Sequence, residues 1–347
     1  MNDAVTLDHL GWRTHFSSQL DVESSAPRAR VMNVHRAHID VLGEIGAASI
    51  ELAGADSGMR LTVGDWVLLD DDGMRIEKRL EPFGVFQRRA AGTSGTIQTI
   101  AANVDTLFIV TSANRDFNVA RLERYLAIAH DAGAFPVIVI TKADLSESPE
   151  AYAANAARLS PGVLVETLDA RDAEQIDVLK AWCGAGQTVA LLGSSGVGKS
   201  TIINTLSGSD QHTSAARDDD QRGRHTTTSR SMHALPGGGW LIDTPGMREL
   251  QLVDIGDALD DVFADVAALA ETCRFADCAH ETEPGCAVQR AIEAEELDPD
   301  RLRRYRKLQS EDRRNSETIA ERRSRDKSLG KMYKTVQSGK RQQKGSE

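Results

Sequence analysis

The sequence predicts a multidomain chain with an N-terminal β-barrel of the OB-fold type, a central α/β domain and a C-terminal helical domain. Short alternating apolar and polar segments, separated by glycines, run through residues 28–90. Longer apolar segments alternate with amphipathic ones over 100–250, and a cluster of cysteines among helical patterns follows over 251–310. A chain of 347 residues also has room for two or three domains of about 150 residues each.

Composition and charge favour a soluble protein. No apolar run reaches the roughly 18 residues of a membrane-spanning helix, and the N-terminus lacks the basic-then-apolar order of a secretion signal. We expect a cytoplasmic monomer with no membrane partner. The net charge is −11, yet residues 301–347 carry 16 Lys and Arg against 6 Asp and Glu. The basic tail, predicted over 311–347, is either a solvated end or a segment that lies along phosphates.

The first 90 residues contain a predicted arm and a predicted barrel. Residues 1–27 show little pattern and end in Ser, Ala and Pro, which indicates a flexible N-terminal arm. Strand-like segments follow at 29–34, 38–42, 50–52, 65–69 and 74–79. Five short strands fit a small closed barrel, of which the OB-fold is the five-stranded form. Such barrels bind oligonucleotides or serve as packing modules, and without a clear row of aromatic residues both alternatives stay open.

The pattern changes after a linker rich in Gly, Ser and Thr, which is predicted over 88–99. Strands are predicted at 106–111, 136–141 and 163–167, and helices at 118–132, 149–159 and 173–183. Continuous apolar strands that alternate with amphipathic helices indicate a parallel sheet covered on both faces.

A glycine-rich loop continues this domain after an apolar run at 188–192. It matches G-x-x-x-x-G-K-[ST], and its predicted phosphate-binding residues are Gly193, Ser194, Ser195, Gly196, Val197, Gly198, Lys199, Ser200 and Thr201. The backbone N–H groups of such a turn at a helix N-terminus can surround phosphates. We expect the Lys199 ammonium to contact the outer phosphates and assist catalysis, and the Ser200 hydroxyl to hold Mg²⁺.

A second motif, Thr141-Lys142-Ala143-Asp144, ends the strand at 136–141 and matches [NT]-K-x-D. The Asp144 carboxylate can accept from N1–H and the exocyclic amine of guanine, whereas adenine lacks that amine. The same four letters also begin ordinary helices, but the carboxyl end of a strand is where doubly wound sheets bind ligands. The motif therefore favours GTP and GDP.

Two further segments predict a magnesium site and a switch. A buried strand ends in Asp243-Thr244-Pro245-Gly246, which matches D-x-x-G. We expect Asp243 to hold Mg²⁺ through water and the Gly246 amide to contact the third phosphate of the nucleotide. Upstream lies a threonine run in which Thr226 or Thr227 would complete the magnesium shell.

The order of these motifs is unusual. Ordinary P-loop GTPases run from the glycine loop to the switch threonine, D-x-x-G and finally [NT]-K-x-D, but here the base-reading motif comes first. Either 141–144 is a coincidence or the domain is circularly permuted. Asp169 and Ala170, after the strand at 163–167, stand where a second base-contacting loop should follow, which favours permutation.

A cysteine cluster follows the D-x-x-G strand. Cys273, Cys278, His280 and Cys286 have the spacing C-x4-C-x-H-x5-C. Three thiolates and an imidazole make a closed tetrahedral shell for Zn²⁺, so this site is predicted to be structural rather than catalytic.

Together these motifs make the chain similar to the circularly permuted ribosome-biogenesis GTPase family RsgA (YjeQ). The resemblance covers roughly residues 28–310. It implies a GTPase that acts late in assembly of the small (30S) ribosomal subunit, contacts its rRNA, is stimulated by that particle and helps to release other assembly factors. Thr141 replaces the commoner asparagine, and Asp169 replaces the serine usual in the second base loop, so both contacts to guanine are expected to be weaker.

The residue that activates water is the open point of the predicted mechanism. Met247 follows D-x-x-G where many GTPases have a glutamine, and a thioether cannot orient water. Intrinsic hydrolysis should therefore be slow. By resemblance to the family, His225 is the candidate catalytic residue, because an imidazole can orient or deprotonate water.

Two other interpretations stay open at this point. One is an RNA-binding protein in which the zinc domain, barrel and basic tail bind RNA and the P-loop is regulatory or vestigial. The intact Lys199, Ser200 and Asp243 argue against it. The other is an ATP-using P-loop enzyme, which Asp144 disfavours.

Overall fold

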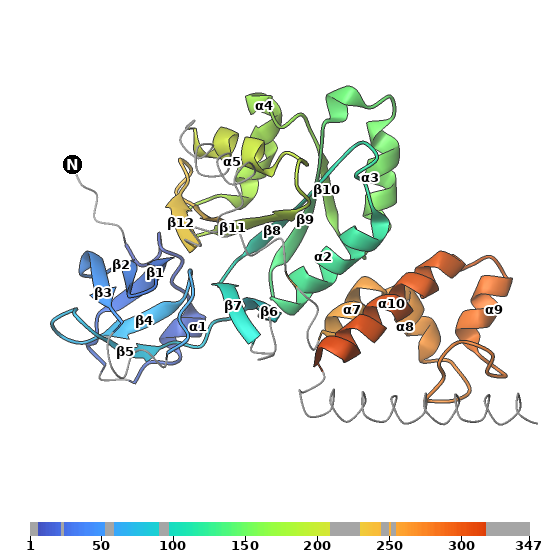
Figure 1. The fold of residues 1–347 in the computed structure, drawn as a ribbon, viewed down its shortest axis with the longest axis horizontal. Helices are drawn as coiled ribbons and strands as arrows, with labels where there is room; N and C mark the ends of the chain where they lie inside the picture. The colour runs from blue at the N-terminus through green and yellow to red at the C-terminus, as the bar shows by residue number, and fades with distance from the viewer. Residues whose placement is uncertain are drawn as a thin grey trace, which may run out of the picture.

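A computed structural model describes residues 6–21, 24–52, 59–89, 97–208, 230–243, 250 and 255–316, and all structural statements below concern these residues. Figure 1 shows three parts along the chain: N-terminal strands in blue, a central sheet with helices in green and yellow, and C-terminal helices in orange and red. No helix in these ranges is both long and apolar enough to span a bilayer.

The N-terminal part contains five antiparallel strands, the number predicted. They are β1 (Arg28–Val34), β2 (His38–Gly43), β3 (Gly46–Glu51), β4 (Trp66–Leu69) and β5 (Ile76–Arg79). The strands pair in the order β3-β2-β1-β4-β5. Alternation along β2 buries Ile39 and Val41, which pack with Val31, Ile50, Val67 and other apolar side chains in a core of their own. Alternating strands therefore fold over one apolar face, as the sequence pattern predicted.

The predicted flexible arm is wrong for residues 6–21. This segment includes the short helix α1 (Thr14–Ser17), and Leu10 and Phe16 are fully buried. The Trp12 and Trp66 rings meet edge to face with centroids 4.8 Å apart. The burial could not be predicted because the apolar residues of the arm follow no helical or strand period, and only the adjoining barrel gives them a surface to pack against.

The fully buried Arg30 ties the arm to the rest of the molecule. Its guanidinium donates to the carbonyl oxygens of Leu10 at 2.5 Å, Asn103 at 3.1 Å and Gly64 at 3.3 Å. Burial, the largest influence, lowers the pKa of Arg30 to about 10. Arg30 thus joins the arm, the barrel and the entry to the central domain through three backbone acceptors.

The predicted linker is also partly wrong. Residues on both sides of 90–96 form an antiparallel pair, β6 (Val85–Arg89) and β7 (Ile97–Ala102), with Arg89 opposite Ile97. Loops that connect the strands of a hairpin are also rich in Gly, Ser and Thr, so composition alone could not distinguish a hairpin loop from a linker between domains.

The central sheet is parallel, as predicted. Its strands are β8 (Thr106–Ser112), β9 (Phe135–Thr141), β10 (Leu164–Thr167), β11 (Thr188–Gly193) and β13 (Trp240–Asp243), in the order β10-β9-β8-β11-β13. Successive side chains of β8 enter different cores: Leu107 and Ile109 pack in one cluster, Phe108 and Val110 in another. This period of two explains why the strands are apolar throughout.

Helices cover both faces of this sheet. Their bounds are α2 (Val119–Asp131), α3 (Pro149–Ala157), α4 (Ala173–Ile176), the 3₁₀ helix η3 (Asp177–Trp182) and α5 (Lys199–Ser207). Leu122 and Leu126 of α2 pack in the first cluster, and Ile202 and Leu206 of α5 in the second. The helix predicted at 173–183 is divided between α4 and η3.

The five N-terminal strands and the central sheet share one hydrogen-bonded ladder. Strand β12 (Arg230–Ala234) runs antiparallel to β13 and pairs on its other side with β1, with Asn33 opposite Ser231 and Val34 opposite Arg230. The two parts are therefore continuous through backbone hydrogen bonds.

The C-terminal part is helical, with α7 (Gly256–Val262), α8 (Ala264–Ala270), α9 (Ala287–Glu293) and α10 (Pro299–Ser316). Helix α10 continues beyond residue 310, so the predicted boundary between the zinc domain and the tail falls inside a helix. Glu123 of α2, itself fully buried, accepts from Arg301 at 2.7 Å and from Arg304 at 2.8 Å. These ion pairs fasten the helical domain to the central one.

Candidate nucleotide and metal sites

The glycine loop lies between β11 and α5, as predicted. β11 is buried along its whole length and lies between β8 and β13, and α5 begins at Lys199. Gly196 and Gly198 have φ angles of +77° and +100°, which side-chain-bearing residues rarely adopt. At Gly193 a Cβ would lie 2.2 Å from the Val110 carbonyl oxygen. The loop therefore requires glycine at all three positions, and its turn exposes N–H groups at a helix N-terminus.

Two cationic side chains meet at this loop. The Lys199 ammonium donates to the carbonyl oxygens of Gly193, at 2.8 Å, and of Ser194. Arg121, in the first turn of α2, donates to the Ser194 hydroxyl at 2.5 Å. Lys199 was predicted here and Arg121 was not, because α2 shows no motif and lies 73 residues away in the chain. Together they place two positive charges where phosphates would bind.

Thr141 supports the phosphate loop. Thr141 is fully buried, and its hydroxyl oxygen lies 2.6 Å from the Val197 carbonyl oxygen, to which it donates, and 3.1 Å from the Thr111 carbonyl oxygen. A Cβ on Gly198 would come within 3.4 Å of the Thr141 side chain. The first residue of the T-K-A-D motif therefore positions the loop from the end of β9. Lys142, next to it, has a left-handed φ of +59°. The chain therefore turns after β9, and the short 3₁₀ helix Ala143–Leu145, which contains Asp144, begins there.

Arg171 brings the two predicted base-contacting carboxylates together. It donates to Asp144 Oδ2 at 2.6 Å and to Asp169 Oδ2 at 2.8 Å. Its side-chain hydrogen bonds are the largest cause of an Asp169 pKa below the usual value. Arg171 was missed, although it directly follows the Asp169-Ala170 pair. The carbonyl of Ala170 accepts from Thr205 of α5 at 3.2 Å, so the same loop also contacts the helix that follows the phosphate loop.

Asp243 ends β13 on the same edge of the sheet. Since Ala190 of β11 lies opposite Ile242, Asp243 is level with Leu191, just before the glycine loop. It is exposed, as is Ser200 at the start of α5. The carboxylate and hydroxyl predicted to hold magnesium therefore flank one loop. The remaining predicted residues, His225, Thr226, Thr227 and Gly246, lie outside the described residues.

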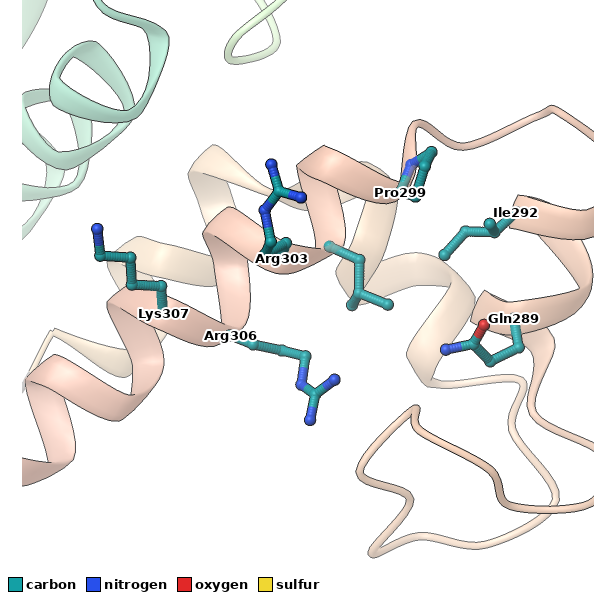
Figure 2. Close-up of a pocket in the computed structure, with 7 residues that line it drawn as sticks. Gln289, Ile292, Pro299, Arg303, Arg306 and Lys307 are labelled. Carbon is teal, nitrogen blue, oxygen red and sulfur yellow. The ribbon is translucent and has the colours of Figure 1, made fainter.

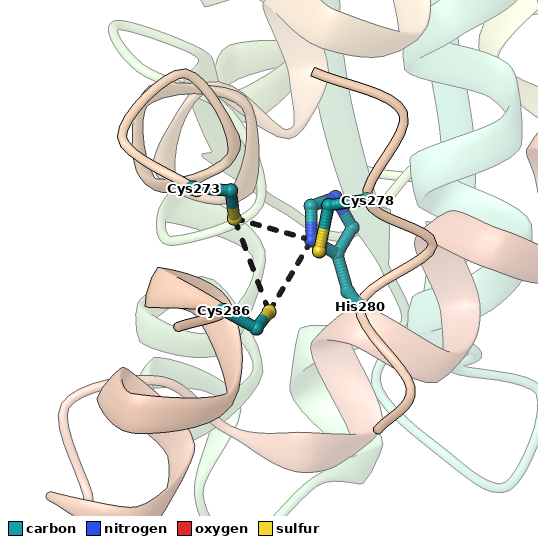
Figure 3. Close-up of side chains that lie close together, drawn as sticks. All are labelled: Cys273, Cys278, His280 and Cys286. Atoms are coloured by element: carbon teal, nitrogen blue, oxygen red, sulfur yellow. Dashed lines mark hydrogen bonds between the residues drawn. The ribbon is translucent and has the colours of Figure 1, made fainter. Parts of the chain in front are cut away.

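The predicted metal ligands of the helical domain also come together (Figure 3). The Nδ1 atom of His280 is 3.6 Å from Cys273 Sγ and 3.5 Å from Cys286 Sγ, and these two sulfurs are 3.9 Å apart. One ligand atom from each of these residues and from Cys278 lies within 4.8 Å of the others. Zinc bonds of about 2.3 Å to sulfur and about 2.0 Å to nitrogen place tetrahedral ligands roughly 3.5–3.8 Å apart. The donor set and its spacing fit Zn²⁺.

Backbone amides surround the sulfur atoms of this cluster. The Ala287 N–H donates to Cys273 Sγ at 3.3 Å, and the Gln289 N–H donates to Cys286 Sγ at 3.4 Å. Both amides belong to the start of α9, whose N-terminus favours negative charge. This end of α9 therefore suits thiolate ligands.

A basic pocket lies between α9 and α10 (Figure 2). Its lining residue Gln289 donates to the carbonyl of His280, so the pocket adjoins the metal cluster. It is lined by Gln289, Ile292, Pro299, Leu302, Arg303, Arg306 and Lys307. Arg303 pairs with Asp300 at 2.8 Å, and Arg306 pairs with Glu281. The pocket is far in the chain from the glycine loop and offers cations rather than catalytic groups, so it suits a polyanionic surface better than a small substrate.

The arrangement at the sheet edge defines the class of protein, a P-loop GTPase whose chain order is circularly permuted. Solved structures share the fold. The chain superposes on YjeQ from Thermotoga maritima with a TM-score of 0.60 and 24% identity, covering 81% of this chain and 96% of that one. The structure titled YloQ, a circularly permuted GTPase, gives a TM-score of 0.61 with 23% identity and covers 86% and 99%.

Sequence relatives identify the family. A family model described as RsgA GTPase matches residues 82–253. The Mesorhizobium japonicum protein named small ribosomal subunit biogenesis GTPase RsgA is 51% identical over 316 residues, which are 90% of this chain and 91% of the relative. A Vibrio parahaemolyticus relative, named small ribosomal subunit biogenesis GTPase RsgA 2, is 48% identical over 98% of this chain and 95% of its own. The chain belongs to the RsgA GTPase family.

Proposed function

We propose that this protein hydrolyses GTP as a late assembly factor of the small ribosomal subunit, in the cytoplasm and in contact with rRNA. The observation that carries the proposal is the meeting of the glycine loop, Thr141–Asp144 and Asp243 at one edge of one parallel sheet. Relatives that match nearly the whole chain bear the name small ribosomal subunit biogenesis GTPase. The alternative of an RNA-binding protein with a vestigial P-loop is weaker, because the loop keeps its glycines and its lysine in place.

Each group at the site has a proposed part in binding. The loop amides and Lys199 hold the phosphates, and Arg121 adds a charge beside Ser194. Asp144 accepts from guanine after its contact with Arg171 opens, and Arg171 remains on Asp169. Ser200, Asp243 and one of Thr226 and Thr227 would hold Mg²⁺, and the ion would supply positive charge to the phosphate oxygens.

Hydrolysis requires a water in line with the third phosphate. His225 is the proposed residue that orients this water, and contact with the ribosomal particle is the proposed event that places His225. The Gly246 amide contacts the third phosphate in this scheme. Lys199 stabilises the charge that develops on the transferred group.

The outer domains have proposed supporting parts. The five strands, in an order that matches an OB-fold opened between β3 and β5, and the pocket at Arg303, Arg306 and Lys307 offer surfaces for rRNA. Zn²⁺ bound by Cys273, Cys278, His280 and Cys286 would keep the helical domain folded.

The decisive experiment is GTP turnover by the full chain, alone and with purified small or large ribosomal subunits. We expect slow turnover alone and stimulation by the small subunit only. The Lys199→Ala variant should lose turnover yet keep subunit binding at low salt. Equal turnover with and without the small subunit would contradict the assembly role while leaving the GTPase intact.

Base specificity has its own test. Asp144→Asn should weaken GDP binding and improve binding of xanthosine diphosphate, because xanthine presents a carbonyl where guanine presents the amine and an amide can donate to it. Titration of the unsubstituted protein and of Asp144→Asn with GDP and with xanthosine diphosphate measures this change of preference. Similar affinities of the unsubstituted protein for GDP and ADP would overturn the guanine assignment.

A further inference from the structure

A second cluster of metal-ligating side chains lies on the barrel, far from the Cys and His cluster. His35 lies in the connection between β1 and β2, and His38 and Asp40 lie in β2. The Nε2 atom of His35 is 3.1 Å from Asp40 Oδ2, and the Nε2 atom of His38 is 3.9 Å from Asp40 Oδ1. The two imidazole rings stack at an interplanar angle of 21° with centroids 4.3 Å apart. Two imidazoles therefore lie beside one carboxylate, and rotation of one ring would direct both nitrogens at one ion.

The surroundings hold this carboxylate in position. The Asn33 side-chain amide donates to Asp40 Oδ2 at 3.1 Å, and the His35 N–H donates to the His38 carbonyl at 2.9 Å, which closes the connection. The Asp40 carboxylate is therefore held with Oδ2 toward His35 and Asn33.

We propose that His35, His38 and Asp40 bind a divalent transition-metal cation of the Zn²⁺, Co²⁺ and Ni²⁺ class. Two imidazoles and one carboxylate suit these ions better than Mg²⁺ or Ca²⁺, which prefer oxygen ligands alone. One ligand atom from each of the three residues lies within 4.8 Å of the others. The His35 Nε2 to Asp40 Oδ2 separation of 3.1 Å is near the roughly 3.4 Å between tetrahedral ligand atoms with bonds of about 2.0–2.1 Å.

The site differs from the Cys and His cluster in two ways. It has three protein ligands instead of four, which leaves a position open to water or another ligand. Its side chains are also about one-third or more exposed, with 35% for His35 and Asp40 and 41% for His38. The ion should therefore exchange more readily than one held by three thiolates.

The location joins this site to the central domain. Asp40 lies opposite Asn33, Asn33 lies opposite Ser231 of β12, and Ser231 lies opposite Asp243. One row of polar residues thus crosses the sheet from the proposed cation to the nucleotide edge. A cation that links His35, in the connection after β1, to His38 and Asp40 of β2 braces the end of β1 that pairs with β12.

The test is titration of the full chain, freed of metal with a chelator, with Co²⁺ as the probe. The Cys and His cluster should give an intense thiolate-to-metal absorption band, and the barrel site should take a second ion without adding to that band. We expect two Co²⁺ per chain. His35→Ala and His38→Ala should each lose the second ion and keep the thiolate band. Asn33→Ala should lower the affinity for the second ion about 10–100-fold.

Matched variants make the result decisive. His9→Ala removes another exposed histidine, outside the cluster, and should leave both ions bound. Asp40→Asn keeps the side-chain volume and removes the charge, so it tests the site if an alanine variant fails to give the far-ultraviolet circular dichroism of the parent. Uptake of only one Co²⁺ by the parent, or a second ion that survives all three ligand substitutions, would overturn the proposal.

Discussion

The two modules that flank the central domain are attached to it in different ways. The barrel is joined through backbone groups: β1 pairs with β12, and Arg30 donates to the carbonyls of Leu10, Gly64 and Asn103. The helical module is joined chiefly through an ion-pair network: Arg301 and Arg304 both donate to Glu123, and Arg301 also donates to the Leu159 carbonyl. Both junctions bury an arginine, but only in the helical junction does the buried arginine donate to a carboxylate, Glu123, that is buried as well.

The difference has an energetic consequence. Carbonyl acceptors are neutral and remain in place whatever side chain replaces Arg30. Glu123 is a fully buried carboxyl group, and burial raises its pKa against the opposing attraction of Arg304 and the hydrogen bonds from Arg301 and Arg304. A buried carboxylate that loses a partner is costly. The helical junction should therefore be the more sensitive of the two to single substitutions.

The largest expected effect concerns the interior of the helical module. Chelation of metal, or Cys286→Ser, should open residues 255–316 while the barrel and central sheet stay folded, because structural zinc supplies on the order of 10 kcal/mol to small domains. Hydrogen exchange resolved along the chain measures this. Cys183→Ala, at a buried cysteine outside the cluster, is the control for Cys286→Ser: it should keep the parent's protection of 255–316 with metal present and lose it, like the parent, on chelation. Equal protection of 255–316 with and without metal would contradict the prediction.

Arg301→Ala should have the next largest effect. It leaves Glu123 with Arg304 alone, and we expect a loss of about 3–5 kcal/mol in the free energy of unfolding in urea. A carboxyl with a raised pKa loses folded-state stability as pH rises above its unfolded value of 4.5, and loss of Arg301 raises that pKa further. The deficit should thus grow between pH 5 and pH 8.

Two variants control this measurement. Arg303→Ala removes an arginine of the same helix whose side chain is 75% exposed, and it should change stability by less than about 0.5 kcal/mol. Glu123→Leu combined with Arg301→Met should recover much of the loss, because no unpaired carboxylate remains. A deficit that is the same at both pH values would remove Glu123 from the explanation.

Arg30→Met should cost less, about 1–3 kcal/mol, because it leaves carbonyl oxygens rather than a charge without their donor. Gly64 O keeps a donor, the Asn103 side-chain amide at 2.9 Å. The measurement is again unfolding in urea, with the exposed Arg75→Met as the matched control. If Arg30→Met proves more costly than Arg301→Ala, the proposed ranking of the two junctions is reversed.

The smallest effect is expected at a second contact of the helical junction. Arg124 of α2 pairs with Glu311 of α10, and their side chains are 29% and 20% exposed. Partly exposed ion pairs are weak and screened by salt, so Arg124→Ala should cost less than about 1 kcal/mol. The cost should shrink further in 1 M salt. A loss as large as that of Arg301→Ala would show that burial of the carboxylate is not what distinguishes the two contacts.

Local chemistry made much of the candidate site predictable. Contact with phosphates requires the glycines at 193, 196 and 198 and the lysine at 199, and contact with a base requires the carboxylate at 144. Each requirement falls within one short segment of the chain, so each produces a motif that can be recognised in the sequence. The strands that hold them are apolar because helices cover both faces. The four metal ligands of the helical domain are close in sequence for the same reason, so their grouping could be predicted as well.

Only the tertiary structure decided how distant segments meet. Arg121 reaches Ser194 across 73 residues, and Arg30 reaches Asn103 across the same number, yet neither arginine belongs to a local motif. The arm at 6–21 is buried because the barrel offers it an apolar surface, not because of its own periodicity. Local sequence thus determined which groups could bind a nucleotide or a metal. Long-range packing and pairing of buried polar groups decided which side chains support them and how the three domains are joined.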